Sequence, residues 1–173
     1  MPASFTPKNY CFACGPDNPE GLRLVFRYTP KKHLVVCTVK IPARYQGATG
    51  FAHGGILATL LDEAMAKSNG LSGIRAMTLR LHVSYRRVAS IERKLRLTGW
   101  RIRKRGRKLN LRSELRDPAG NLLAEARGLF LEVAVPPKGI PSPSIAGASK
   151  RPTQSRSRKR PKASKGTSLP RRS

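Results

Sequence analysis

The pattern of apolar and polar residues over positions 1–138 predicts one helix among several strands. From Gly54 to Ser68 apolar residues recur three and four positions apart, and Asn69-Gly70 supplies a helix-ending signal. Six other runs have the alternation or composition of strands, at residues 22–28, 33–41, 78–87, 95–105, 107–116 and 122–135. One helix followed by antiparallel strands predicts an α+β fold in which the sheet wraps over that helix.

The composition changes sharply near the C-terminal end of the printed sequence. Residues 141–173 contain ten Lys or Arg and eight Ser, but no acidic and no aromatic residue. Such a segment cannot bury enough apolar surface to offset the entropy lost on ordering. We therefore expect a globular domain at 1–138 and a disordered basic tail at 139–173. The tail serves solubility, or it makes non-specific contact with nucleic acid or anionic lipid.

The chain carries a net charge of +26, of which +10 belongs to residues 141–173 and +16 to the rest. This balance favours a polyanionic partner, either nucleic acid or a phosphate-bearing ligand, but it does not specify a fold. No apolar run is long enough to cross a membrane, and the N-terminus lacks the pattern of a secretory signal. Three cysteines in a chain of this size fit a reducing compartment, so we expect a cytoplasmic protein.

The segment His53-Gly54-Gly55 lies at the start of the predicted helix. A helix N-terminus presents unsatisfied backbone N–H groups and the positive end of the helix dipole. Glycines at this point let a ligand approach the backbone closely. The arrangement suits a carbonyl oxygen that becomes an oxyanion during reaction.

Asp62 is the unusual residue of this otherwise apolar helix. It follows Gly55 by seven residues, or about 10 Å along a helix axis, which is too far for both to act on one atom. Cooperation would require Asp62 from a second subunit, and hence sites at a dimer interface. The alternative is that Asp62 pairs with a buried backbone group or an arginine. In an apolar interface its pKa should be raised, which suits a general base near neutral pH.

Five stretches of the chain match a known family pattern: Cys11–Leu22, Tyr45-Gln46-Gly47, His53–Glu63, Gly106-Arg107-Lys108 and Ala124–Gly128. With these stretches, residues 10–135 resemble the PaaI-like family of hotdog-fold acyl-CoA thioesterases. The resemblance implies a curved antiparallel sheet around one long helix, with subunits paired into dimers or tetramers. It also implies hydrolysis of an acyl-CoA to the free acid and coenzyme A without any cofactor.

The same resemblance assigns roles to the residues around the predicted helix. Gly54, with Gly55 adjacent, would donate a backbone N–H to the thioester carbonyl. Asp62 would act as general base on water or as nucleophile. Thr78, seven positions before Tyr85, would assist the water.

Substrate-binding residues are expected on both sides of this machinery. His53 would orient its loop or bind substrate, and Gln46 lies beside Gly47, where some family members have an asparagine that positions the thioester. The run 101–108 holds six basic residues, including Arg107 and Lys108, which are suited to grip the phosphates of coenzyme A. The alternatives for this run are a solvated hairpin and a nucleic-acid contact.

Cys11 and Cys14 form a Cys-x-x-Cys pair. Zinc normally takes four ligands and no second pair follows, while the strand-turn-helix context of a redox pair is missing. The pair is therefore expected to form a turn that packs on the sheet, and no metal is predicted. The alternative function for the whole chain is a non-catalytic hotdog module that binds acyl-CoA or nucleic acid through its basic surface and tail.

Overall fold

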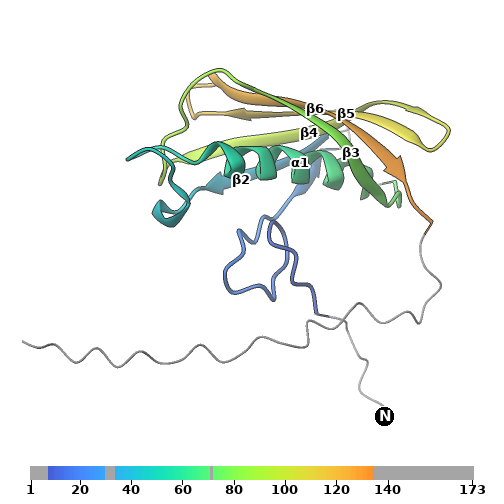
Figure 1. The fold of residues 1–173 in the computed structure, drawn as a ribbon, viewed down its shortest axis with the longest axis horizontal. Coiled ribbons are helices and arrows are strands. Elements are labelled where there is room, and N and C mark those ends of the chain that lie inside the picture. Colours follow the sequence, from blue (N-terminus) through green and yellow to red (C-terminus); the bar gives the residue numbers. More distant parts are fainter. Residues whose placement is uncertain (1–7, 30–33, 71, 135–173) are drawn as a thin grey trace, which may run out of the picture. The chain divides into compact units, whose positions relative to one another are not determined.

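The computed structural model describes residues 8–29, 34–70 and 72–134, which form one α-helix, a 3-10 turn and a six-stranded sheet (Figure 1). The elements are β1 (Arg27–Thr29), β2 (Leu34–Lys40), the 3-10 turn (Ala43–Tyr45), α1 (Gly54–Gly70), β3 (Ala76–Tyr85), β4 (Lys94–Arg105), β5 (Lys108–Arg116) and β6 (Leu122–Glu132). The expected domain boundary at 138 and the tail 139–173 lie outside the described residues. No helix in the described part has the length and apolar character needed to cross a membrane.

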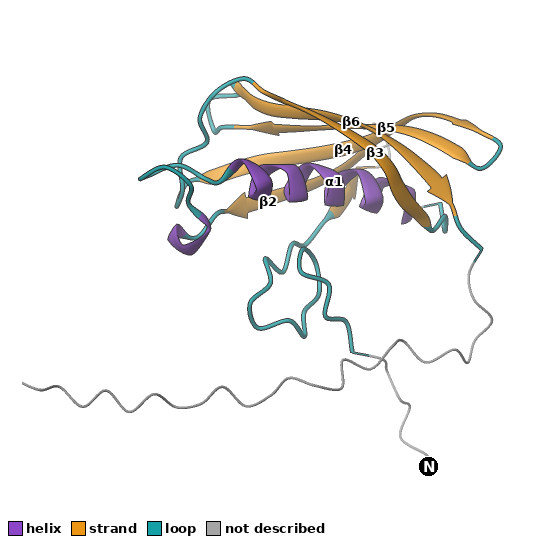
Figure 2. Cartoon of the chain, viewed as in Figure 1, coloured by secondary structure: helices purple, strands orange, loops and turns teal. Residues whose placement is uncertain are grey.

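The sheet has the strand order β1-β2-β4-β5-β6-β3, and every neighbouring pair is antiparallel. It curves over α1, which packs against one of its faces (Figure 2). The predicted α+β architecture, with a curved antiparallel sheet around one long helix, is confirmed. β3 follows α1 in the chain but lies at the sheet edge opposite β1.

The core lies between α1 and the sheet, as the helical and alternating periodicities predicted. The buried apolar side chains of α1 are those of Leu57, Leu60, Leu61, Ala64 and Met65. On β4 the chain approaches the helix so closely that a Cβ at Gly99 would lie 2.3 Å from the Ala64 carbonyl oxygen. The glycine is therefore required by backbone-to-backbone packing.

The first predicted strand is wrong over most of its length. Leu22 and Leu24 alternate like strand residues, but their N–H groups donate to Phe12 and Ala13 carbonyl oxygens, at 2.8 and 2.9 Å. Arg23 between them has a φ of 49°, outside the extended region. The segment belongs to an N-terminal loop, and pairing with β2 begins at Arg27.

β3 departs from simple alternation where its pairing with β6 is irregular, between Thr78 and Arg80. Leu79, which alternates with polar neighbours in this strand, is 54% exposed, and Met77 is 65% exposed. The strand therefore presents apolar side chains at an open edge. Such an edge, with unpaired backbone groups, is a natural place for another strand to add.

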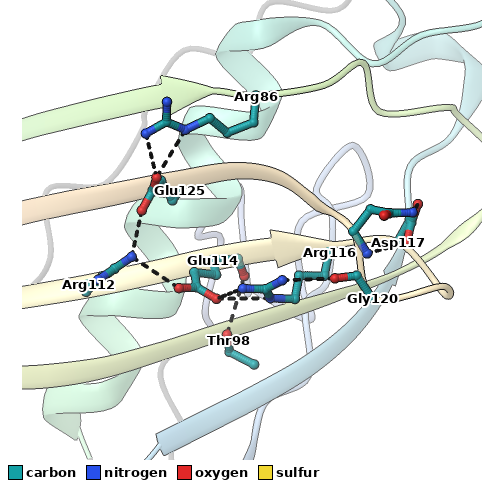
Figure 3. Close-up of polar contacts among 9 residues, drawn as sticks. Arg86, Thr98, Arg112, Glu114, Arg116, Asp117, Gly120 and Glu125 are labelled. Atoms are coloured by element: carbon teal, nitrogen blue, oxygen red, sulfur yellow. Dashed lines mark hydrogen bonds and ion pairs between the residues drawn. The ribbon is translucent and has the colours of Figure 1, made fainter.

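The face of the sheet turned away from α1 carries an alternating ladder of arginine and glutamate side chains (Figure 3). Glu125 accepts hydrogen bonds from Arg86 at 2.9 Å and from Arg112 at 2.8 Å. Arg112 also lies 3.3 Å from Glu114, which pairs with Arg116 at 2.8 Å. The strand register places Glu114 directly opposite Glu125, so these ion pairs run diagonally between strands or along β5. Diagonal pairs of opposite charge stabilise a sheet modestly, and here they also separate the two facing carboxylates.

Candidate active site

The loop before α1 is a tight hairpin that places His53 at the helix start. Gln46 and Ala52 form an isolated bridge, and the His53 N–H donates to the Tyr45 carbonyl oxygen at 3.0 Å. A Cβ at Gly47 would lie 3.2 Å from the His53 Cα, so glycine suits this close approach. The structure thus brings Gln46, Gly47 and His53, three of the predicted substrate-binding residues, into one loop.

Gln46 uses its side chain within this loop. Its Oε1 accepts the Gly50 N–H at 3.3 Å, and the residue is exposed. This contact supports the hairpin rather than pointing to a substrate. Among the described residues, the contact of the Gln46 side chain is thus with its own loop, which it stabilises.

The two glycines of the motif differ in what their N–H groups do. The Gly55 N–H donates to His53 Nδ1 at 3.0 Å. Among the described residues, no acceptor is bonded to the Gly54 N–H. Gly54 is the first residue of α1, so its N–H belongs to the unsatisfied donors at the positive end of the helix. The geometry therefore favours Gly54 over Gly55 as the donor to a carbonyl oxygen.

Tyr85 anchors the end of β3 to this helix start, a role that the sequence analysis missed. Its hydroxyl donates to the Gly54 carbonyl oxygen at 3.0 Å. A Cβ at Gly54 would make ordinary contact with the Tyr85 ring at 3.6 Å. The position of Tyr85 at the end of an alternating strand was visible in the sequence, but nothing there indicated its partner.

Asp62 lies on the same helix, half-buried, and is held by Thr78 of β3. The Thr78 hydroxyl donates to Asp62 Oδ1 at 2.9 Å, so the structure brings these two predicted residues together. Burial raises the pKa of the Asp62 carboxyl above its ordinary value; the Thr78 hydrogen bond opposes this rise, and the nearby Glu63 carboxylate adds to it. The direction is the one expected for a carboxylate in an apolar setting.

Within one protomer the two halves of the site stay apart. Gly54 and Asp62 are eight residues apart on α1, which is about 12 Å along the axis. The contact pairs Gly54–Tyr85 and Asp62–Thr78 therefore form two separate groups on a single helix. One protomer cannot apply both to the same reacting atom.

Arg107 and Lys108 lie at the opposite end of the sheet from Gly54. Lys108 pairs in register with Leu131, which also faces Met77 at the start of β3, whereas Tyr85 lies at the other end of that strand. The Arg107 guanidinium donates twice to the Glu132 carbonyl oxygen, at 3.1 Å each, and so ties the β4–β5 turn to the end of β6. Neither residue joins the Gly54 site of its own protomer.

A second cluster, also missed from the sequence, joins the N-terminal loop to α1. The Sγ atoms of Cys11 and Cys14 and a carboxylate oxygen of Glu63 lie within 4.8 Å of one another. Burial, aided by the Glu63 hydrogen bond and opposed by Lys67, raises the pKa of the Cys14 thiol to about 11. Glu63 is far from the cysteines in sequence, so spacing alone could not indicate the contact.

Comparison with known proteins identifies relatives of this site. The sequence model of the thioesterase superfamily matches residues 49–124, which include His53, Asp62 and Thr78. Acyl-coenzyme A thioesterase THEM5 of Mus musculus is 33% identical over 72 residues, which cover 42% of this chain and 29% of that protein. The chain thus spans less than a third of the curated relatives it matches.

Solved structures extend the similarity to about two thirds of the chain. One crystal structure of a thioesterase superfamily protein has a TM-score of 0.65 at 31% identity, covering 69% of this chain and 61% of that chain. A second has a TM-score of 0.58 at 31% identity, covering 64% of this chain and 84% of that chain. The PaaI protein of E. coli, from the phenylacetic acid degradation operon, shares the fold at 18% identity with a TM-score of 0.59, covering 65% and 81%.

Proposed function

Since the chain belongs to the thioesterase superfamily, as its resemblance to hotdog-fold enzymes led us to expect, we propose that it hydrolyses the thioester bond of an acyl-CoA. The substrate class is supported by the THEM5 relative, whose name states acyl-coenzyme A thioesterase activity for that protein. The observation that carries the proposal is the Gly54 N–H, which has no acceptor among the described residues, at the start of the helix that also holds Asp62.

The first part of the chemistry is polarisation of the thioester carbonyl. Its oxygen accepts the Gly54 N–H, and the dipole of the 17-residue helix favours the negative charge that develops there. His53 accepts the Gly55 N–H through Nδ1, which fixes the ring and the loop around this donor. His53 and Gly55 are in this proposal positioning residues.

The second part is activation of water by Asp62. The carboxylate takes a proton from water, the resulting hydroxide bonds to the carbonyl carbon, and a tetrahedral oxyanion forms. Collapse of this intermediate breaks the carbon–sulfur bond, and the coenzyme A thiolate takes the proton back from Asp62. Thr78 donates to Oδ1, so the carboxylate is oriented while its other oxygen stays available for water.

The Gly54 N–H and the Asp62 carboxylate can act on the same thioester when Asp62 comes from a partner subunit. β3 is an open edge with exposed Met77 and Leu79. If two copies pair through this edge about a two-fold axis, the start of one β3 lies beside the end of the other. The Asp62–Thr78 pair of one copy then approaches the Gly54–Tyr85 pair of its partner.

The same antiparallel pairing of two β3 strands supports a substrate-binding role for Lys108. Lys108 lies at the Met77 end of its own sheet, so pairing through β3 brings it toward the Gly54 end of the partner copy. There its ammonium group can bind a coenzyme A phosphate. Arg107, already donating to Glu132, holds the hairpin that presents Lys108.

A panel of acyl-CoA substrates tests the activity directly. With a reagent that detects free thiols, we expect release of one coenzyme A for each acid formed by the purified chain. Binding of acyl-CoA without turnover across the panel would instead support the non-catalytic hotdog module. A basic-surface partner is tested separately by measuring nucleic-acid binding with and without residues 139–173.

Mixing two inactive variants tests the shared site. Asp62→Asn removes the base, and Gly54→Pro removes the N–H at the first helical position, where proline is well tolerated. Random exchange gives half heterodimers, each with one intact composite site, so activity should return to about a quarter of the wild-type level. If the mixture stays inactive while subunit exchange is demonstrated, Asp62 does not act across the interface.

A further inference from the structure

The Cys11–Cys14–Glu63 cluster lies outside the proposed thioesterase machinery and unites two distant parts of the chain. Cys11 is exposed, Cys14 is half-buried, and the Glu63 side chain on α1 is 15% exposed. The two sulfur atoms and a Glu63 oxygen lie within 4.8 Å of one another. Three side chains of metal-ligating type therefore converge on one point.

The loop that carries the cysteines is shaped by its own backbone. The Gly15 N–H donates to the Cys11 carbonyl oxygen at 2.8 Å, and a Cβ at Gly15 would lie 2.4 Å from the Asn9 carbonyl oxygen. Only glycine fits this turn. Asn9 Oδ1 accepts the Cys11 N–H at 3.0 Å, and Asp17 accepts the Asn9 N–H at 2.6 Å. The turn thus holds both thiols near each other without help from α1.

We propose that Cys11, Cys14 and Glu63 form a binding site for a thiophilic divalent cation of the zinc class. Two sulfur atoms and one carboxylate oxygen make three ligands of a tetrahedral set, with the fourth position left to water. At zinc–sulfur distances of about 2.3 Å, two ligand sulfurs lie about 3.8 Å apart. The two sulfur atoms therefore have to approach each other by no more than about 1 Å. Thiolates favour zinc over magnesium or calcium.

Lys67 neutralises the negative charge of the Glu63 carboxylate before a metal cation binds. Its ammonium group lies 3.5 Å from the Glu63 carboxylate, one turn further along α1. The side chain is 39% exposed, so it can move into solvent when a cation takes its place. Binding then exchanges one cation for another beside Glu63 and releases the two thiol protons.

Cation binding to tag-free, reduced, full-length protein tests the site. Titration with Zn²⁺ against a chromophoric chelator should show one tight site per chain. Co²⁺ should give thiolate-to-metal charge-transfer absorption and the strong visible bands of tetrahedral cobalt. Cys14→Ser should weaken Zn²⁺ binding at least about 100-fold, and Lys67→Met should strengthen it. The matched control is Cys37→Ala, which removes a buried core thiol and should leave the affinity unchanged.

Three results would overturn the proposal. One is that the protein binds no Zn²⁺ when the two are mixed in equal concentrations. Another is binding that persists in Cys11→Ser/Cys14→Ser, which would place it elsewhere. The third is a Co²⁺ spectrum without thiolate bands. Thioesterase activity enters none of these readouts, so the site and the proposed function stand or fall separately.

Discussion

The face of the sheet that covers α1 and the face turned away from it hold their charged groups in different ways. On the α1 side, Asp62 has one hydroxyl partner, Thr78, and burial raises the pKa of its carboxyl. On the outer side, Glu125 lies between two arginines, and hydrogen bonds from Arg86 lower its pKa. The Asp62 carboxyl therefore takes up a proton more readily than an ordinary aspartate, whereas Glu125 is held as an anion that supports the sheet.

The largest effect is expected where the inner face meets the helix backbone. In Gly99→Val the new Cβ would lie 2.3 Å from the Ala64 carbonyl oxygen, so β4 and α1 must separate. We expect loss of the folded state, because the total stability of such a domain is about 5–15 kcal/mol and this clash involves backbone. Soluble yield and circular dichroism measure it. Gly70→Ala is the control, since a Cβ there meets nothing within 4 Å. A folded, stable Gly99→Val protein would contradict the close packing.

Periodicity predicted α1 and the four long strands because burial on one face repeats along each element. It could not predict that Leu22 and Leu24 bond to Phe12 and Ala13, since loop contacts leave no period in the sequence. The sequence pattern also predicted that the helix begins at Gly54 and that Asp62 is the unusual acidic residue within it. Which glycine N–H lacks an acceptor among the described residues depends on the direction of the His53 ring, which only the folded loop decides.

The next effect is expected on catalysis at Asp62. Asp62→Asn should lower kcat about 10²–10⁴-fold, as the loss of a general base does, while the unfolding midpoint stays near that of the wild type. The amide keeps the size of the side chain and can still accept from Thr78. Steady-state kinetics and thermal unfolding measure the two quantities. Full activity in this variant would remove Asp62 from the mechanism.

A smaller catalytic effect is expected from the hydroxyl that orients this carboxylate. Thr78→Val removes the 2.9 Å hydrogen bond to Asp62 and should lower kcat about tenfold, with little change in KM. Thr98→Val is the matched control, because the Thr98 hydroxyl donates to the Glu114 carbonyl oxygen, away from Asp62. If both variants lose activity equally, the two faces of the sheet do not differ as we infer.

The smallest effect is expected on the outer ladder. Glu125→Gln removes the anion between Arg86 and Arg112 and should cost about 1 kcal/mol of unfolding free energy, since solvent screens the half-exposed Arg86. Urea unfolding measures the change, and kcat should not move. Glu132→Gln, which removes one ion pair with Lys104, should cost less.

The unfolding free energy lost in Glu125→Gln should depend on pH, because the pKa of Glu125 is lowered in the folded chain. A carboxyl whose pKa is lower in the folded chain than in the unfolded chain adds stability above its unfolded pKa, about 4.3 for glutamate. That stability is lost as pH falls through the lowered folded-state value. The difference in unfolding free energy between the wild type and Glu125→Gln should therefore be constant at neutral pH and shrink below about pH 4. A difference that persists at low pH would mean that Glu125 acts through packing, as inner-face residues do, and not through its charge.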